Sequence, residues 1–118
     1  MPNPLRVKMD DPLYRFLRNG DIAQFNNFVS SGTSADLVNC DFRGVDLRGL
    51  AADGLDFSGC YFRQADLRGI DFSHANLEGA SISGAKISGV LFPAELLADE
   101  IELSLVHGTR MRYRQASR

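Results

Sequence analysis

Residues 35–94 repeat with a period of five, and this repeat restricts the possible folds more than any other feature of the chain. The tract contains twelve units, among them CDFRG, VDLRG, ADLRG and ANLEG. The third residue of each unit, here called the centre, is apolar in every unit, as is the residue two places before it, although only 44% of the chain is hydrophobic. The twelve centres are Leu37, Phe42, Leu47, Ala52, Phe57, Phe62, Leu67, Phe72, Leu77, Ile82, Ile87 and Phe92.

A period of five matches neither the 3.6 residues of an α-helix nor the 2.0 of a long strand, so the chain must turn every five residues. Four such units close a square coil of twenty residues, and twelve units give three coils stacked about 4.8 Å apart. Glycine ends eight of the twelve units, where corners need unusual backbone angles. Ala52 is the one small centre, so we expect Phe25 or Phe28 to fill the space beside it.

These units resemble the repeat of the pentapeptide-repeat family, whose members fold as right-handed quadrilateral β-helices. The resemblance covers 60 of the 118 residues. It implies a mainly β chain: a right-handed quadrilateral parallel β-helix of three coils, with an N-terminal helical cap and a C-terminal helix. It also implies a short, stand-alone bacterial protein. The fold alone does not determine an activity.

The chain divides into five expected segments. Asp11-Pro12 and Asp21 are helix-start signals, Gln24 would complete a capping box with Asp21, and glycines end both helices. The segments are a flexible arm (1–10), an N-terminal helical cap (11–34), the pentapeptide-repeat β-helix (35–94), a C-terminal helix (95–108) of uncertain start and a basic tail (109–118).

The C-terminal helix carries two apolar stripes. One stripe can cover the last coil, and it consists of Leu97, Ala98, Ile101 and Leu105. The other consists of Leu96, Leu103 and Val106 and needs another partner, either the tail residues Met111 and Tyr113 or a second copy of the protein. Pentapeptide-repeat proteins often pair through their C-terminal helices, so the resemblance adds a homodimer through this stripe to the alternatives.

Outward positions of the repeat also stack. Arg43 lies under Arg63 and Arg48 lies under Arg68, and these four residues are here called the Arg block. Aspartates in the same units partly neutralise it, and we expect the opposite side, which carries Asp53 and Asp71, to be acidic. The Arg block is either a solvated, salt-bridged surface or a site for an anion or a partner protein.

Catalytic, cofactor and metal sites are not expected. Cys40 and Cys60 occupy one inward column and are read as buried free thiols, while His74 and His107 are read as surface residues. No phosphate-binding loop or dinucleotide fingerprint is found. The formal charge is only −2, which does not favour direct nucleic-acid binding. No apolar stretch is long enough to span a membrane, so we expect a cytoplasmic protein.

Two classes of function remain. The leading one is a non-catalytic protein–protein interaction or scaffold module with an unknown protein partner and an unknown pathway. The alternative comes from the resemblance, because long members of the family protect gyrase by mimicking DNA. This chain departs from them in three ways: its stack of three coils is short, its faces include the Arg block, and its repeat has no register break that would make room for a projecting loop. An enzyme is not expected.

Overall fold

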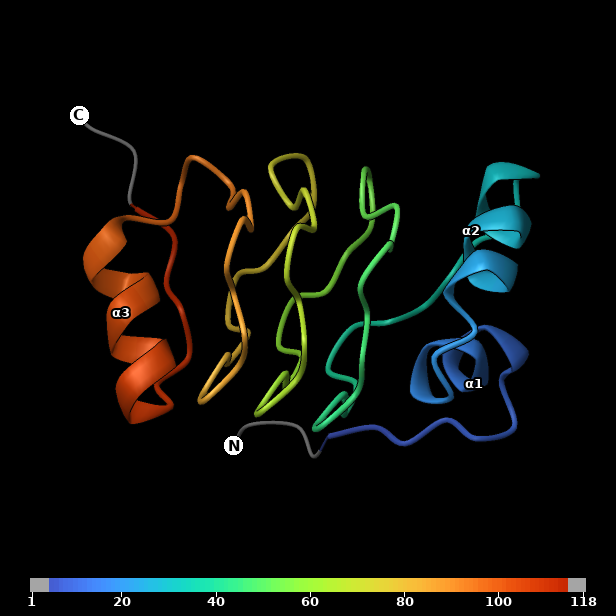
Figure 1. The fold of residues 1–118 in the computed structure, drawn as a ribbon, viewed down its shortest axis with the longest axis horizontal. Coiled ribbons are helices and arrows are strands. Elements are labelled where there is room, and N and C mark those ends of the chain that lie inside the picture. Colours follow the sequence, from blue (N-terminus) through green and yellow to red (C-terminus); the bar gives the residue numbers. More distant parts are fainter. Residues whose placement is uncertain (1–4, 115–118) are drawn as a thin grey trace.

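The structure, a computed structural model, describes residues 5–114. Helices α1 (Pro12–Arg18) and α2 (Ile22–Ser30) lie at one end, and α3 (Ala98–His107) lies at the other. Figure 1 shows the repeats between them as a stack of turns of the chain, seen from the side. The molecule measures 39 × 28 × 25 Å. Both ends of the stack are therefore covered by helices, as the sequence predicts.

Parallel β-bridges join residues twenty apart, which confirms the twenty-residue coil. Asp41 pairs with Tyr61 and Tyr61 with Ser81, so one position is seen at three successive levels; Asp46, Asp66 and Lys86 form a second such series. Within residues 5–114 these bridges are isolated, and the only regular elements are the three helices. The expectation of a mainly β chain is therefore not met as regular strands, because a corner every five residues leaves only about one paired residue on each side of the coil.

The inward register is confirmed. Twenty of the twenty-four inward residues are buried, and the other four, which lie at the two ends of the repeat, are partly buried: Ala35, Ile87, Val90 and Phe92. Like residues stack on like, since the rings of Phe42 and Phe62 are stacked with their centroids 5.6 Å apart. Cys40 and Cys60 are buried free cysteines. The hydrophobic core is thus a set of ladders running along the stack.

Each corner is a tight turn closed by a backbone hydrogen bond. At one of them the N–H of Leu50 donates to the carbonyl oxygen of Leu47 at 3.1 Å, and Gly49 between them has φ of +89°. All eight repeat glycines have positive φ, as expected for the third residue of such a turn. Two corners use other residues in the same conformation: Asn39 at φ +59° and Gln64 at φ +58°.

The N-terminal cap closes the first coil with side chains as well as with apolar surface. Asp11 caps α1 as predicted, whereas the side chain of Asp21 makes no capping bond at the start of α2. The hydroxyl of Tyr14 donates to the carbonyl of Asp41, and the amide of Asn26 both donates to the carbonyl of Gly49 at 2.9 Å and accepts from the N–H of Ala51 at 3.0 Å. These bonds satisfy backbone groups that would otherwise lie unpaired at the edge.

Two N-terminal details differ from or refine the sequence expectations. Arg6, expected in a flexible arm, lies on the edge of the first coil, because it forms a parallel bridge with Cys40 and pairs its backbone with Asn39 and Asp41. Residues 1–4 of that arm lie outside the described residues. Of the two aromatic residues proposed to lie beside Ala52, Phe25 is fully buried in the same core, while Phe28 is 46% exposed and stacks on Phe16.

The C-terminal segment covers the last coil in two ways. From α3, Ser104 accepts the N–H of Ile82 at 3.0 Å and the carbonyl of Leu105 accepts the N–H of Gly84. The chain then turns back, so that Met111 exchanges backbone hydrogen bonds with Gly79 and Ala80. Part of the expected basic tail is therefore the covering of the last coil, and its final residues, 115–118, are not described.

Candidate interaction surfaces

Three units of the repeat carry an aspartate and, two residues later, an arginine on the outside, and in each unit the two side chains pair with each other. In Asp46-Leu47-Arg48 the carboxylate accepts the backbone N–H of Arg48 at 3.1 Å and, from the same side chain, Nε at 3.0 Å and Nη2 at 2.7 Å. The same arrangement recurs in the two other pairs of this type, Asp41 with Arg43 and Asp66 with Arg68. The aspartate thus fixes both the turn and the guanidinium.

The charges of these pairs are balanced locally. The hydrogen bond from Arg68, followed by its backbone N–H and the charges of Arg68 and Arg48, lowers the pKa of Asp66 to about 2. Arg48 also reaches Asp66 across the coils, with Nε 3.4 Å from Oδ2. The structure thus brings Arg48 and Arg68 onto one carboxylate. Three members of the Arg block are therefore already forked onto aspartates.

The fourth member, Arg63, lies in the unit CYFRQ, which departs from the repeat twice. Tyr61 stands where six of the other eleven units carry aspartate, and Gln64 stands where eight of them carry glycine. Among residues 5–114, Arg63 has no carboxylate partner. Its guanidinium instead lies 5.6 Å from the centroid of the Tyr61 ring, and that of Arg43 lies 5.8 Å from the same ring. The structure thus brings Arg43 and Arg63 together around an aromatic side chain.

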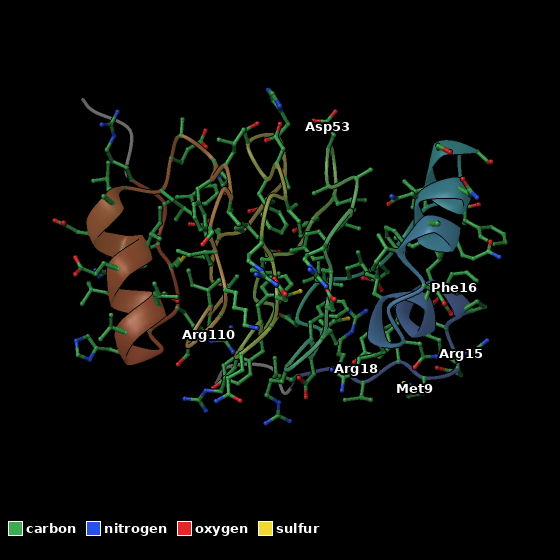
Figure 2. The ribbon with its side chains drawn as sticks, viewed as in Figure 1. Met9, Arg15, Phe16, Arg18, Asp53 and Arg110 are labelled. Atoms are coloured by element: carbon green, nitrogen blue, oxygen red, sulfur yellow. The ribbon has the colours of Figure 1, made fainter. Side chains whose placement is uncertain are left out.

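Arg110 joins this group from the tail, and sequence reasoning missed it. Its guanidinium is 6.0 Å from the Tyr61 centroid, and its Nη1 donates to the carbonyls of Gly59 at 2.9 Å and Gly79 at 2.7 Å. We call Tyr61, Arg43, Arg63 and Arg110 the Tyr61 cluster. Figure 2 shows Arg110 and Asp53 on opposite sides of the stack. The substitution of tyrosine for aspartate in one unit was a signal for Tyr61, but no sequence feature placed Arg110.

The outer face of α3 is the second surface, and it differs in part from the predicted one. Leu103 and Val106 are 41% and 61% exposed, as the second stripe requires. Leu96 of that stripe is buried, because it precedes α3, which begins only at Ala98, and so does not lie on the helical face that carries Leu103 and Val106. Leu97, assigned to the covering stripe, is 46% exposed. A shallow surface hollow on this face is lined by Asp99, Glu102, Leu103, Val106 and His107.

The titratable groups elsewhere form no relay in the described chain. Nδ1 of His74 lies 3.4 Å from Asp53 and 3.3 Å from Oγ of Ser73, so a single ring nitrogen faces both groups, whereas a catalytic triad uses one nitrogen for each. Burial raises the pKa of the Cys60 thiol, whose Sγ lies 2.8 Å from the carbonyl of Leu37. Residues 5–114 hold no cluster of three or more side chains suited to a metal ion.

The geometry defines a repeat protein in which five-residue units stack in register, with apolar side chains inside and paired charges outside. The family model for pentapeptide repeats matches eight copies, over residues 30–49 and 56–92. The chain belongs to the pentapeptide-repeat family. Comparisons with curated proteins and with solved structures give no match. In the described part of the chain, no helix combines the length and apolarity needed to cross a membrane.

Proposed function

We propose that the protein is a non-catalytic interaction or scaffold module. The observation that supports this most is the outward array: the Asp–Arg pairs and Arg110 are held in place by hydrogen bonds to the repeat backbone, and Arg43, Arg63 and Arg110 gather around the ring of Tyr61. A surface fixed before binding loses little side-chain entropy when a partner docks. Membership of the family points the same way, since pentapeptide-repeat proteins are generally not enzymes.

We further propose that the stack is a right-handed quadrilateral β-helix of three coils. The bridges between residues twenty apart and the turn at every fifth residue support this architecture. A cytoplasmic, bacterial setting is part of the proposal. The free cysteines Cys40 and Cys60 fit a reducing compartment.

The outer face of α3 is the proposed homodimer contact. Leu103 and Val106 are exposed on the face that does not cover the coils, and a second copy would remove them from water. With Leu96 buried in its own chain, the proposed contact rests on the other two residues of the predicted stripe. The topoisomerase alternative gains no support here, because a DNA mimic needs a continuous anionic surface and the Arg block interrupts it.

The module is tested by purifying the tagged protein at its natural level of expression from its own cell and identifying the proteins that accompany it. The expected result is one partner that rebinds the purified protein directly in a two-component assay. Turnover of a small molecule by the pure protein, or the absence of any partner that survives reconstitution, would contradict the proposal.

A further inference from the structure

We infer that Tyr61, Arg63 and Arg110 form a docking site for the carboxylates of an acidic segment of a partner protein. This inference rests on the interaction function proposed above and names the chemistry that the partner must present. Of the four residues of the Arg block, it assigns only Arg63 to the binding site, because the other three arginines are already paired with aspartates.

The first step is the balance of charge. Arg43, Arg48 and Arg68 each place a guanidinium fork on an aspartate at 2.7 Å. Within residues 5–114, Arg63 and Arg110 pair with no carboxylate, and the groups that accept from Arg110 are neutral carbonyls. Two uncompensated positive charges therefore lie within 6.0 Å of one ring centroid. Such a concentration of like charge attracts an anion.

The second step is preorganisation. The backbone of Tyr61 is bridged to Asp41 on one side and to Ser81 on the other, so the ring is attached to a backbone position that is hydrogen-bonded to both neighbouring coils. Arg110 is tied to two successive coils through Gly59 and Gly79. A guanidinium resting on an aromatic ring keeps donors at its edge that can fork a carboxylate. The cost of ordering these side chains is thus largely met before a partner arrives.

The third step separates an acidic protein segment from a nucleic acid. A phosphate backbone needs many cations in sequence, and its affinity falls steeply when only a few phosphates are contacted. Here only two guanidiniums are uncompensated, and the neighbouring arginines Arg43, Arg48 and Arg68 are already paired with aspartates, so a continuous polyanion finds no further free cations. A segment with spaced carboxylates meets the two charges without crossing the aspartates. An aromatic side chain with arginines is also typical of protein interfaces.

The test uses a fluorescein-labelled twelve-residue peptide of alternating Glu and Ser, with a Gln-Ser peptide as its control, and measures fluorescence anisotropy at low salt. We expect the Glu peptide to bind and the Gln peptide not to bind. Arg63→Gln should weaken binding about threefold to fivefold, at the upper end of the range for one solvent-exposed charge pair. The double variant with Arg110→Gln should weaken it further. The matched control is Arg15→Gln, which removes one positive charge from α1 and should change affinity less than about twofold.

Arg63→Gln is the decisive variant, because the side chain of Arg63 makes no hydrogen bond within the described chain and its loss should leave the fold intact. Arg110→Gln removes two carbonyl bonds, so its thermal unfolding is measured in parallel. Equal binding of the Glu and Gln peptides, or equal losses in Arg63→Gln and Arg15→Gln, overturns the inference. Tighter, Arg63-dependent binding of a twelve-nucleotide single strand would replace the acidic protein by a nucleic acid and also overturn it.

The same variants separate this inference from the interaction function. If a cellular partner is retained equally by the wild type and by Arg63→Gln, the interaction function is supported and the carboxylate site is contradicted. If peptide binding depends on Arg63 but the protein retains no cellular partner, the carboxylate site is supported and the interaction function is contradicted.

Discussion

The hydroxyl of Ser104 in α3 accepts a hydrogen bond from the backbone N–H of Ile82, at 3.0 Å, and both residues are fully buried. This one contact shows how a stack of coils can end. The last coil exposes N–H groups that no further coil receives, and a buried N–H without a partner is costly. Only the carbonyls in the last turn of a helix are free to accept, as that of Leu105 does from Gly84, so at Ile82 a short hydroxyl side chain supplies the acceptor.

Replacing this hydroxyl should therefore destabilise the protein. Ser104→Ala leaves the N–H of Ile82 unpaired, which costs about 1–3 kcal/mol, and the better helix propensity of alanine offsets only about 0.5 kcal/mol. We expect a lower midpoint in urea unfolding, with an unchanged slope. Ser88→Ala, at an exposed serine of the repeat, is the control and should stay within about 0.5 kcal/mol of wild type. Equal stabilities of the two variants would show that the bond does not matter.

A glycine at the corner now formed by Gln64 should raise the stability of the protein. A residue with a Cβ in the left-handed region costs about 1–2 kcal/mol, and Gln64 has φ of +58°. Gln64→Gly removes that strain but gives the unfolded chain more freedom, so the net gain should be about 0.5–1 kcal/mol in unfolding free energy. The converse variant, Gly44→Ala, changes a corner at φ +71° with open space around it and should lose about 1 kcal/mol. A stability change of the opposite sign in either variant would contradict the corner assignment.

The Asp–Arg pairs should make stability depend on acid pH. The folded pKa of Asp66 is about 2, below the ordinary value of about 3.9, chiefly because Arg68 hydrogen-bonds the carboxylate. A depressed pKa gives stability that is fully present above about pH 4 and is lost as the pH falls through about 2. Asp66→Asn keeps an acceptor for the turn but has no charge to lose, so urea midpoints should fall less between pH 4 and pH 2 than in wild type.

The control for this effect is Asp56→Asn. The Asp56 carboxylate accepts the backbone N–H of Ser58 at 2.9 Å in the same kind of turn, and Ser58 stands where Asp66 finds an arginine. We expect this variant to keep the acid dependence of the wild type. If the two substitutions flatten the pH profile equally, the guanidinium is not the cause.

The coil, the inward register and the glycine corners could all be predicted from the sequence because they depend on neighbours within five residues. Phe42 lies over Phe62 because the chain returns after four corners, whatever the ends do. Tyr14, Asn26 and Ser104 could not be assigned in the same way. Their partners are backbone groups 22 to 27 residues away, and which side chain reaches each group depends on how the helices dock.

Of the candidate surfaces, likewise, the parts that follow from the twenty-residue period could be predicted, and the parts that depend on the chain ends could not. The stacking of the Arg block follows from the twenty-residue coil, and the structure brings Arg43 to Arg63 and Arg48 to Arg68. The position of Arg110 depends on the tail folding back along the last coil, which no periodicity encodes. Leu96 was misassigned for a related reason. Its place on a helical wheel assumes that Leu96 is helical, whereas α3 starts only at Ala98.

The proposed dimer can be tested with the same substitution at two equally exposed valines, one inside the proposed contact and one outside it. Val106 on α3 and Val7 near the opposite end of the stack are both 61% exposed, so the same substitution changes surface hydrophobicity equally at the two sites. If a second copy covers α3, Val106→Glu places a charge in an apolar contact, next to Glu102 of its own chain, and the solution mass measured by light scattering should fall from dimer to monomer. Val7→Glu should leave the mass of the wild type unchanged. A wild type that is monomeric at high concentration, or equal behaviour of the two variants, would rule out this contact.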